Sequence, residues 1–106
     1  MELNILERLL ILRAIPKEGD IITLRVLSDL RRNLSLTEEE ISEHNVRSVG
    51  DRVLFDDPDY KLEVAIGERA FDLIQSAFSN LNNIKKLTIE DIPLYERFVE
   101  KKEVGK

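Results

Sequence analysis

The sequence has no cysteine and no tryptophan, and His44 is its only histidine. Without cysteine there is no disulfide and no thiolate metal site, which favours a cytoplasmic protein. A cysteine nucleophile is also excluded, and His44 has no serine or aspartate context that suggests a catalytic triad. We therefore expect a protein that is not an enzyme and that uses no cofactor.

Glycines are few, and each is isolated from the others in the sequence. A phosphate-binding loop needs clustered glycines, so none is expected. No apolar run reaches the ~18–20 residues of a membrane span. No basic stretch precedes the first apolar residues, as it would in a signal peptide. The net charge of −5 gives no general attraction to phosphate or to anionic lipid.

The chain has 106 residues, of which 42% are hydrophobic, and this is enough to bury a core. We expect residues 1–100 to form a single helical domain that contains a β-hairpin at about residues 46–66. Residues 101–106 are polar and are expected to form a frayed tail.

The first predicted helix begins after Asn4, which forms a capping box with Glu7, and it ends near Ile15 because Pro16 lacks the next N–H. Nine of residues 3–15 are apolar, more than one face of a surface helix needs. This helix is therefore either central to the core or part of a homodimer interface.

A second helix is predicted from about Thr23 to Asn33, with Arg25, Arg31 and Arg32 facing water. A short third helix follows a second capping box, Thr37 with Glu40, and ends near Asn45. A fourth helix is predicted from Glu68 to Leu81, and a last one with Asp91 as its cap.

Between the third and fourth helices the apolar period changes to two. Leu62, Val64 and Ile66 alternate with other residues, as in a half-buried strand, and residues 52–55 are its predicted antiparallel partner. Residues 56–60 then form the hairpin loop. The predicted fold is α+β and mostly helical. It has about five helices and one two-stranded hairpin between helices 3 and 4, in a winged-helix-like order.

Some runs of the sequence carry a resemblance to known proteins: Ile5-Leu6-Glu7-Arg8-Leu9-Leu10, Ile15-Pro16-Lys17-Glu18-Gly19, Thr23-Leu24, Leu36-Thr37-Glu38-Glu39-Glu40-Ile41, Glu63-Val64-Ala65-Ile66-Gly67-Glu68 and Leu94-Tyr95-Glu96-Arg97-Phe98. They resemble a group of small, uncharacterised proteins encoded in phage and prophage genomes. The resemblance implies a viral origin, and so the host cytoplasm, and it implies the fold. It implies no functional residue, because the leucines, helix caps and turns that carry the resemblance specify a fold and not a chemistry.

Negative charge is concentrated in residues 37–67, which hold nine acidic and three basic residues, whereas residues 68–106 are neutral. A winged-helix DNA reader places its recognition helix and wing in this part of the chain, and there it needs basic side chains. Nucleic acid is therefore not expected as the ligand of this segment. The alternative is a DNA binder that uses Arg25, Arg31 and Arg32 of the second helix.

Two acidic clusters have the ligand types of metal sites. Glu39, Glu40, Glu43 and His44 lie on one short helix, but di-iron bundles need ligands from several helices. Asp56, Asp57 and Asp59 depart from the EF-hand spacing, because Lys61 stands where the pattern continues. We interpret the first cluster as a solvated helix face and the second as a turn. No metal site is assigned, and an enzyme or metal protein is the third hypothesis.

The leading hypothesis is a non-enzymatic, phage-type binding protein whose acidic helix–hairpin face contacts a protein with a basic surface. Such a face can imitate phosphates and so inhibit an enzyme that binds nucleic acid. Six carboxylates, called the acidic face below, are assigned to this contact: Glu38, Glu39, Glu43, Asp56, Asp57 and Asp59.

Overall fold

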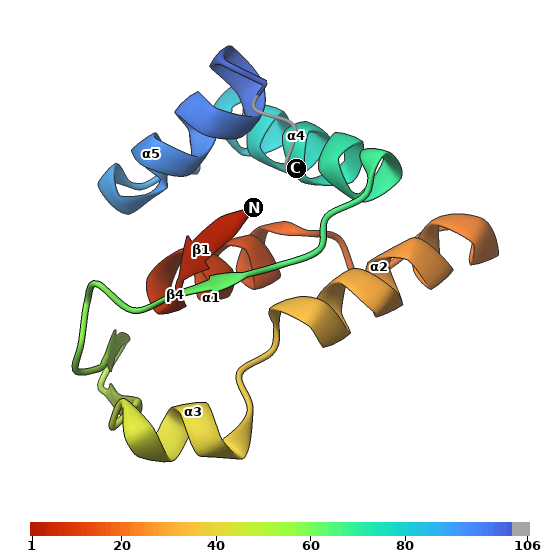
Figure 1. The fold of residues 1–106 in the computed structure, drawn as a ribbon. Coiled ribbons are helices and arrows are strands. Elements are labelled where there is room, and N and C mark those ends of the chain that lie inside the picture. Colours follow the sequence, from red (N-terminus) through yellow and green to blue (C-terminus); the bar gives the residue numbers. More distant parts are fainter. Residues whose placement is uncertain (103–106) are drawn as a thin grey trace.

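A computed structural model describes residues 1–102, and its elements follow in the order shown in Figure 1. They are β1 (Glu2–Asn4), α1 (Ile5–Ala14), α2 (Ile21–Leu34), α3 (Glu38–Glu43), β2 (Arg47–Val49), β3 (Arg52–Leu54), β4 (Lys61–Glu63), α4 (Glu68–Asn83), a 3₁₀ turn η1 (Ile89–Asp91), α5 (Ile92–Tyr95) and a π-helical turn η2 (Glu96–Glu100).

The fold is α+β and mostly helical, as predicted. The helix count differs from the expectation of about five, since the described residues form four continuous α-helices of six residues or more. In the C-terminal segment, α5 is a single turn between a 3₁₀ and a π-helical turn. Of the predicted frayed tail, Lys101 and Lys102 are exposed, and residues 103–106 lie outside the described residues.

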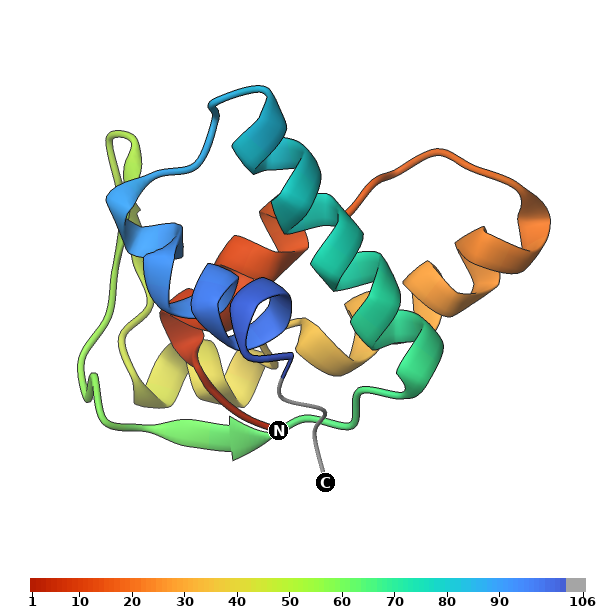
Figure 2. The same ribbon diagram turned by 90° about the horizontal axis from the view of Figure 1, so that it is seen from above.

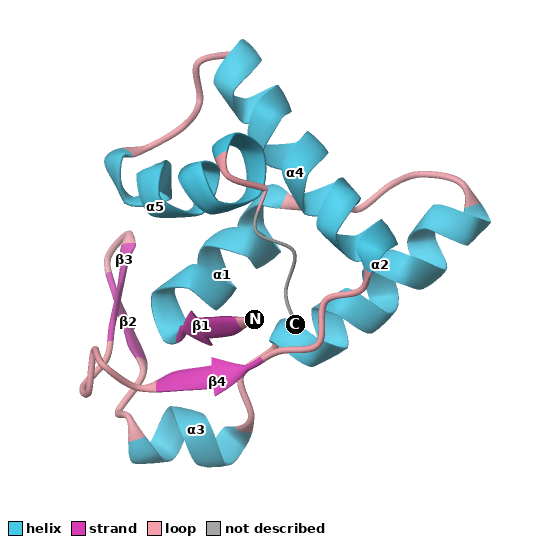
Figure 3. Ribbon diagram, turned by 45° about the horizontal axis from the view of Figure 1, so that its top comes forward, coloured by secondary structure: helices cyan, strands magenta, loops and turns pink. Residues whose placement is uncertain are grey.

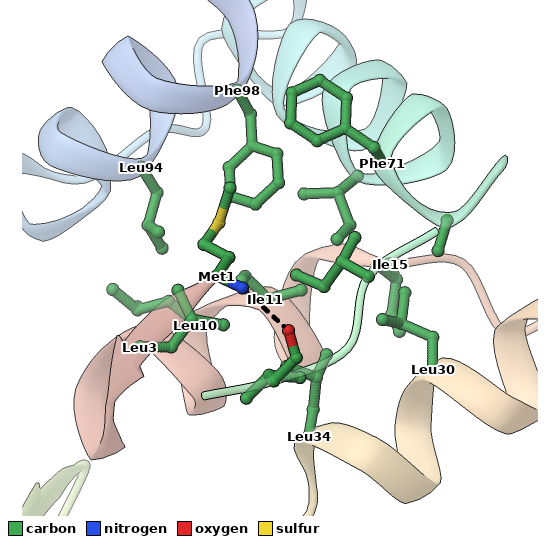
Figure 4. Close-up of a cluster of buried hydrophobic side chains, with 14 of the residues drawn as sticks. Met1, Leu3, Leu10, Ile11, Ile15, Leu30, Leu34, Phe71, Leu94 and Phe98 are labelled. Carbon is green, nitrogen blue, oxygen red and sulfur yellow. Dashed lines mark hydrogen bonds between the residues drawn. The ribbon is translucent and has the colours of Figure 1, made fainter. Parts of the chain in front are cut away.

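Helix α1 lies at the centre of the core. Figure 1 shows α4 and α5 on one side of it and α3 on the other, and Figure 2 shows α2 extending away from this body at its first turn. Ile5 and Ile11 of α1 are fully buried, and so are Phe78 of α4 and Phe98 of the C-terminal segment. Side chains from α1, α2, α4 and the C-terminal segment meet in the cluster of Figure 4, where the Phe71 and Phe98 rings lie 5.0 Å apart. A central position in the core was one of the two alternatives predicted for this helix, and it is confirmed.

Helices begin where the sequence predicts when a capping box joins residues only three positions apart. Both predicted capping boxes form, at Asn4–Glu7 and at Thr37–Glu40. Helix α2 begins two residues earlier than predicted, because the side chain of Asp20 accepts the N–H of Thr23. Asp91 is the N-cap residue of α5, as predicted, but its carboxylate makes no capping hydrogen bond to that helix and instead accepts the N–H of Thr88 and the guanidinium of Arg13.

The predicted strand pairing was also wrong, although a hairpin does lie between α3 and α4. This hairpin pairs β2 with β3 around Gly50 and Asp51 and ends at Leu54. Gly50 has φ +62°, which fits the first central residue of a two-residue type II′ turn. Figure 3 shows β4 pairing instead with β1, in antiparallel register with Leu3 opposite Leu62.

Burial explains why β4 prefers the N-terminal strand. Leu3 of β1 is fully buried, and Val64, the residue after β4, is 2% exposed, although the three residues of β4 itself are exposed. Pairing with the N-terminal strand therefore satisfies the backbone polar groups next to these two buried side chains. The N–H of Val64 donates to the carbonyl of Met1 at 2.9 Å. The strands β2 and β3 are also largely exposed, but their pairing needs only a local turn.

We predict that Ile11→Ala lowers the free energy of unfolding by about 2–5 kcal/mol, because it leaves a cavity in the middle of the core. Ile89→Ala makes the same chemical change at a side chain that is 84% exposed, and it should change stability by less than about 0.5 kcal/mol. Urea denaturation of both variants measures the difference. Equal losses would show that α1 is not the centre of the core.

Candidate functional site

A buried arginine joins three helical elements. The side chain of Arg8, in α1, is 1% exposed, and its Nη1 and Nη2 donate to the two carboxylate oxygens of Glu40, in α3, at 2.6 and 3.0 Å. Its Nε donates to the carbonyl of Leu34 at 3.0 Å and its Nη2 to that of Ser35 at 2.8 Å. Arg8 therefore holds the end of α2 and the start of α3 against α1.

Glu40 accepts four hydrogen bonds on its two oxygens. Besides the two from Arg8, Oε1 accepts the backbone N–H of Thr37 at 3.0 Å, and Oε2 accepts the Tyr60 hydroxyl at 2.7 Å. The hydrogen bonds from Arg8 are the main reason why the pKa of Glu40 falls from 4.5 to about 2, since burial acts in the opposite direction. The same contact with Glu40 raises the pKa of Tyr60.

His44 fastens the loop of residues 56–60 to the end of α3. Its ring stacks on Tyr60 with centroids 4.0 Å apart, and its Nδ1 lies 3.1 Å from a carboxylate oxygen of Asp57. The backbone N–H of Asp56 donates to the His44 carbonyl at 2.7 Å. This loop was predicted to connect the two strands of a hairpin. Instead, it packs against the end of α3.

The solvated helix face predicted for Glu40 and His44 was wrong, because both residues are buried. They are four positions apart, so they share the inner side of a short helix. The arginine on the otherwise apolar side of α1 is the signal that sequence reasoning missed. A guanidinium at Arg8 that faces the core has to find a carboxylate and carbonyls there.

The six residues of the acidic face are all exposed. Glu38 and Glu39 lie in the first turn of α3, and Glu43 lies in its last turn, close enough to Tyr60 to raise the pKa of that hydroxyl further. Asp57 contacts His44, and Asp56 lies 3.9 Å from Arg47. The contacts of Glu40 and His44 thus bring the loop carboxylates next to α3. Asp59 has an exposed side chain in the same loop.

The arginines proposed for nucleic acid lie on α2, away from this network. Arg25 and Arg32 are exposed, and Arg32 lies 3.4 Å from Asp29. Arg31 is half-buried, and its enclosed Nη2 has no hydrogen-bond partner among residues 1–102. The structure therefore presents two of the three guanidinium groups to solvent.

Comparison with protein-family models, with curated proteins and with solved structures finds no match. Within residues 1–102, no group of three or more histidine, aspartate or glutamate side chains is arranged to hold a metal ion. No helix in the same range combines the length and the apolar character that crossing a membrane requires.

The depressed pKa of Glu40 predicts the acid sensitivity of this network. The folded pKa lies below the unfolded one, so the stabilisation is complete above about pH 4.5 and is lost as the pH falls toward 2. We expect Glu40→Gln, which leaves Arg8 without a carboxylate, to be less stable at neutral pH and to lose less additional stability on acidification. Urea midpoints measured from pH 7 to pH 2 test this, and parallel curves for the two proteins would contradict it.

Proposed function

We propose that this chain is a non-enzymatic binding protein whose acidic face docks on the basic surface of another protein. The observation that carries the proposal is the attachment of the loop of residues 56–60 to α3 by Tyr60 and His44. A loose acidic loop would lose conformational entropy on binding, whereas carboxylates on a fixed surface are already ordered.

The chemistry of the acidic face suits a cationic partner. Its six carboxylates are exposed, and one of the nearby bases, Arg47, already lies close to Asp56. Opposite charge on a partner speeds encounter and favours one orientation. An enzyme that binds nucleic acid has such a surface, so occupation of that surface by phage-type carboxylates in place of phosphates would inhibit it. No catalytic step and no cofactor enter this proposal.

DNA binding in a winged-helix-like arrangement is the second candidate function. In it, β2–β3 would act as the wing, and Arg25, Arg31 and Arg32 would contact phosphates. The exposed guanidinium groups of Arg25 and Arg32 favour it. It ranks lower because Asp29 lies beside Arg32 and because repulsion from the acidic face opposes the approach of a polyanion.

Charge reversal of Glu38, Glu39 and Glu43 to lysine tests the leading proposal. The matched control reverses Asp72, Glu96 and Glu100, which are also exposed but lie on α4 and the C-terminal segment. Both triple variants change the net charge equally and should melt within a few degrees of the parent, because exposed charges contribute little to stability. Proteins retained from a cell lysate are then compared by mass spectrometry.

We expect a set of proteins that the parent and the control retain and that the variant of the acidic face loses. The binding should weaken as salt rises toward ~0.5 M. Retention of the same proteins by all three chains would refute the role of the acidic face. A salt-sensitive gel shift of duplex DNA that disappears with Arg25→Glu and Arg32→Glu would instead establish the second candidate.

A further inference from the structure

Tyr60 makes most of the contacts that attach the loop of residues 56–60 to α3. Its hydroxyl donates to a carboxylate oxygen of Glu40 at 2.7 Å, and its ring stacks on that of His44 with centroids 4.0 Å apart. Its backbone N–H donates to the carbonyl of Asp57 at 3.0 Å and closes the turn of the loop. A group added to the hydroxyl would therefore act on the attachment of the whole loop.

The segment around Tyr60 is exposed and acidic. Every one of residues 56–63 is exposed except Tyr60, which is half-buried, and Figure 3 shows the connection from β3 to β4 at the edge of the molecule. Three aspartates precede the tyrosine in the loop, and the nearest base before it is Arg52. Kinases select their substrates partly by charge, and a basic substrate groove selects a tyrosine that follows acidic residues.

The second tyrosine of the chain lacks these features. Tyr95 ends α5, follows Ile92, Pro93 and Leu94, and its hydroxyl accepts the side-chain amide of Asn82 at 3.2 Å. The loop around Tyr60 opens when a few exposed contacts break, whereas Tyr95 leaves its helical segment only if that segment unfolds. The two tyrosines therefore differ both in charge and in access.

A phosphate on Tyr60 would be incompatible with its contact to α3. It carries a charge of about −1.5 to −2 at pH 7, and it would lie beside the carboxylate of Glu40, which repels it. Arg8 cannot compensate a second anion, because its side chain is 1% exposed and its Nε, Nη1 and Nη2 already donate to Leu34, Ser35 and Glu40.

We propose that Tyr60 is a phosphorylation site and that its phosphorylation detaches the loop of residues 56–60 from α3. The hydroxyl oxygen of Tyr60 attacks the γ-phosphorus of ATP, and the bond from that phosphorus to its bridging oxygen breaks. ADP leaves, and the phenolic proton passes to the catalytic aspartate of the kinase.

The modification would separate the carboxylates of the loop from those of α3, and so it would regulate the acidic face. This consequence for partner binding rests on the proposed function. The phosphorylation itself and the release of the loop do not rest on it.

Incubation of the full chain with Mg²⁺-ATP and a purified protein-tyrosine kinase that prefers acidic substrates tests the site. Tandem mass spectrometry locates the phosphate. We expect Tyr60 to be modified about ten times faster than Tyr95, or more. Equal rates at the two tyrosines, or absence of phosphate from Tyr60, would overturn the proposal.

The role of the acidic residues is tested with two double variants of equal charge. Asp56→Asn with Asp59→Asn should slow the modification of Tyr60 by about tenfold or more. The control, Asp72→Asn with Glu100→Gln, changes exposed positions on α4 and the C-terminal segment and should leave the rate unchanged. Equal rates for the two double variants would show that the charge of the loop does not select this tyrosine.

Amide hydrogen exchange on the phosphorylated chain tests the release of the loop. We expect faster exchange at the N–H of Asp56, which donates to the carbonyl of His44, and no change at Phe71 in α4. Tyr60→Phe has no hydroxyl to modify, so treatment with the kinase should leave its exchange unchanged. Unchanged protection of Asp56 in the phosphorylated parent would contradict the release.

Retention of proteins from a lysate separates this proposal from the proposed function. The phosphorylated chain should lose the proteins that the acidic face retains. If the unmodified acidic face retains none, the proposed function fails, whereas the phosphorylation and exchange measurements still decide whether Tyr60 is a switch.

Discussion

The structure depends on one buried guanidinium. Arg8 lies on the central helix of the core, where an unpaired charge would be very costly. The bidentate contact with Glu40 and the carbonyls of Leu34 and Ser35 satisfy it, and they fix where α2 ends and where α3 lies. Removal of one partner from such a buried pair typically costs about 3–5 kcal/mol, because the other charge is left without compensation.

The same contact determines the shape of the proposed binding surface. Glu40 receives the hydroxyl of Tyr60 as well as the guanidinium of Arg8, and Tyr60 stacks on His44. Through these four side chains, α1 fixes the position of the loop that carries Asp56, Asp57 and Asp59. The position of the acidic face thus follows from the hydrogen bonds that satisfy Arg8 in the core.

Local signals in the sequence predicted most of the helical fold, and long-range contacts account for the errors. The capping boxes at Asn4 and Thr37 involve residues three apart, so the sequence contains all that they need. The pairing of β1 with β4 joins residues about sixty positions apart, and the contact of Arg8 with Glu40 joins residues 32 apart. Alternation in residues 62–66 indicated a strand, but it does not specify a partner. The six exposed carboxylates were identified from charge alone, whereas the buried side chains that position them were not.

Amide hydrogen exchange on Arg8→Lys tests most directly whether this arginine holds α3 and its loop in place. Lysine keeps the charge but loses the planar fork that contacts both oxygens of Glu40. We predict faster exchange at the N–H groups of His44 and Asp56, with little change at Phe71 in α4. Unchanged protection at His44 and Asp56, or an equal loss at all three, would contradict the account.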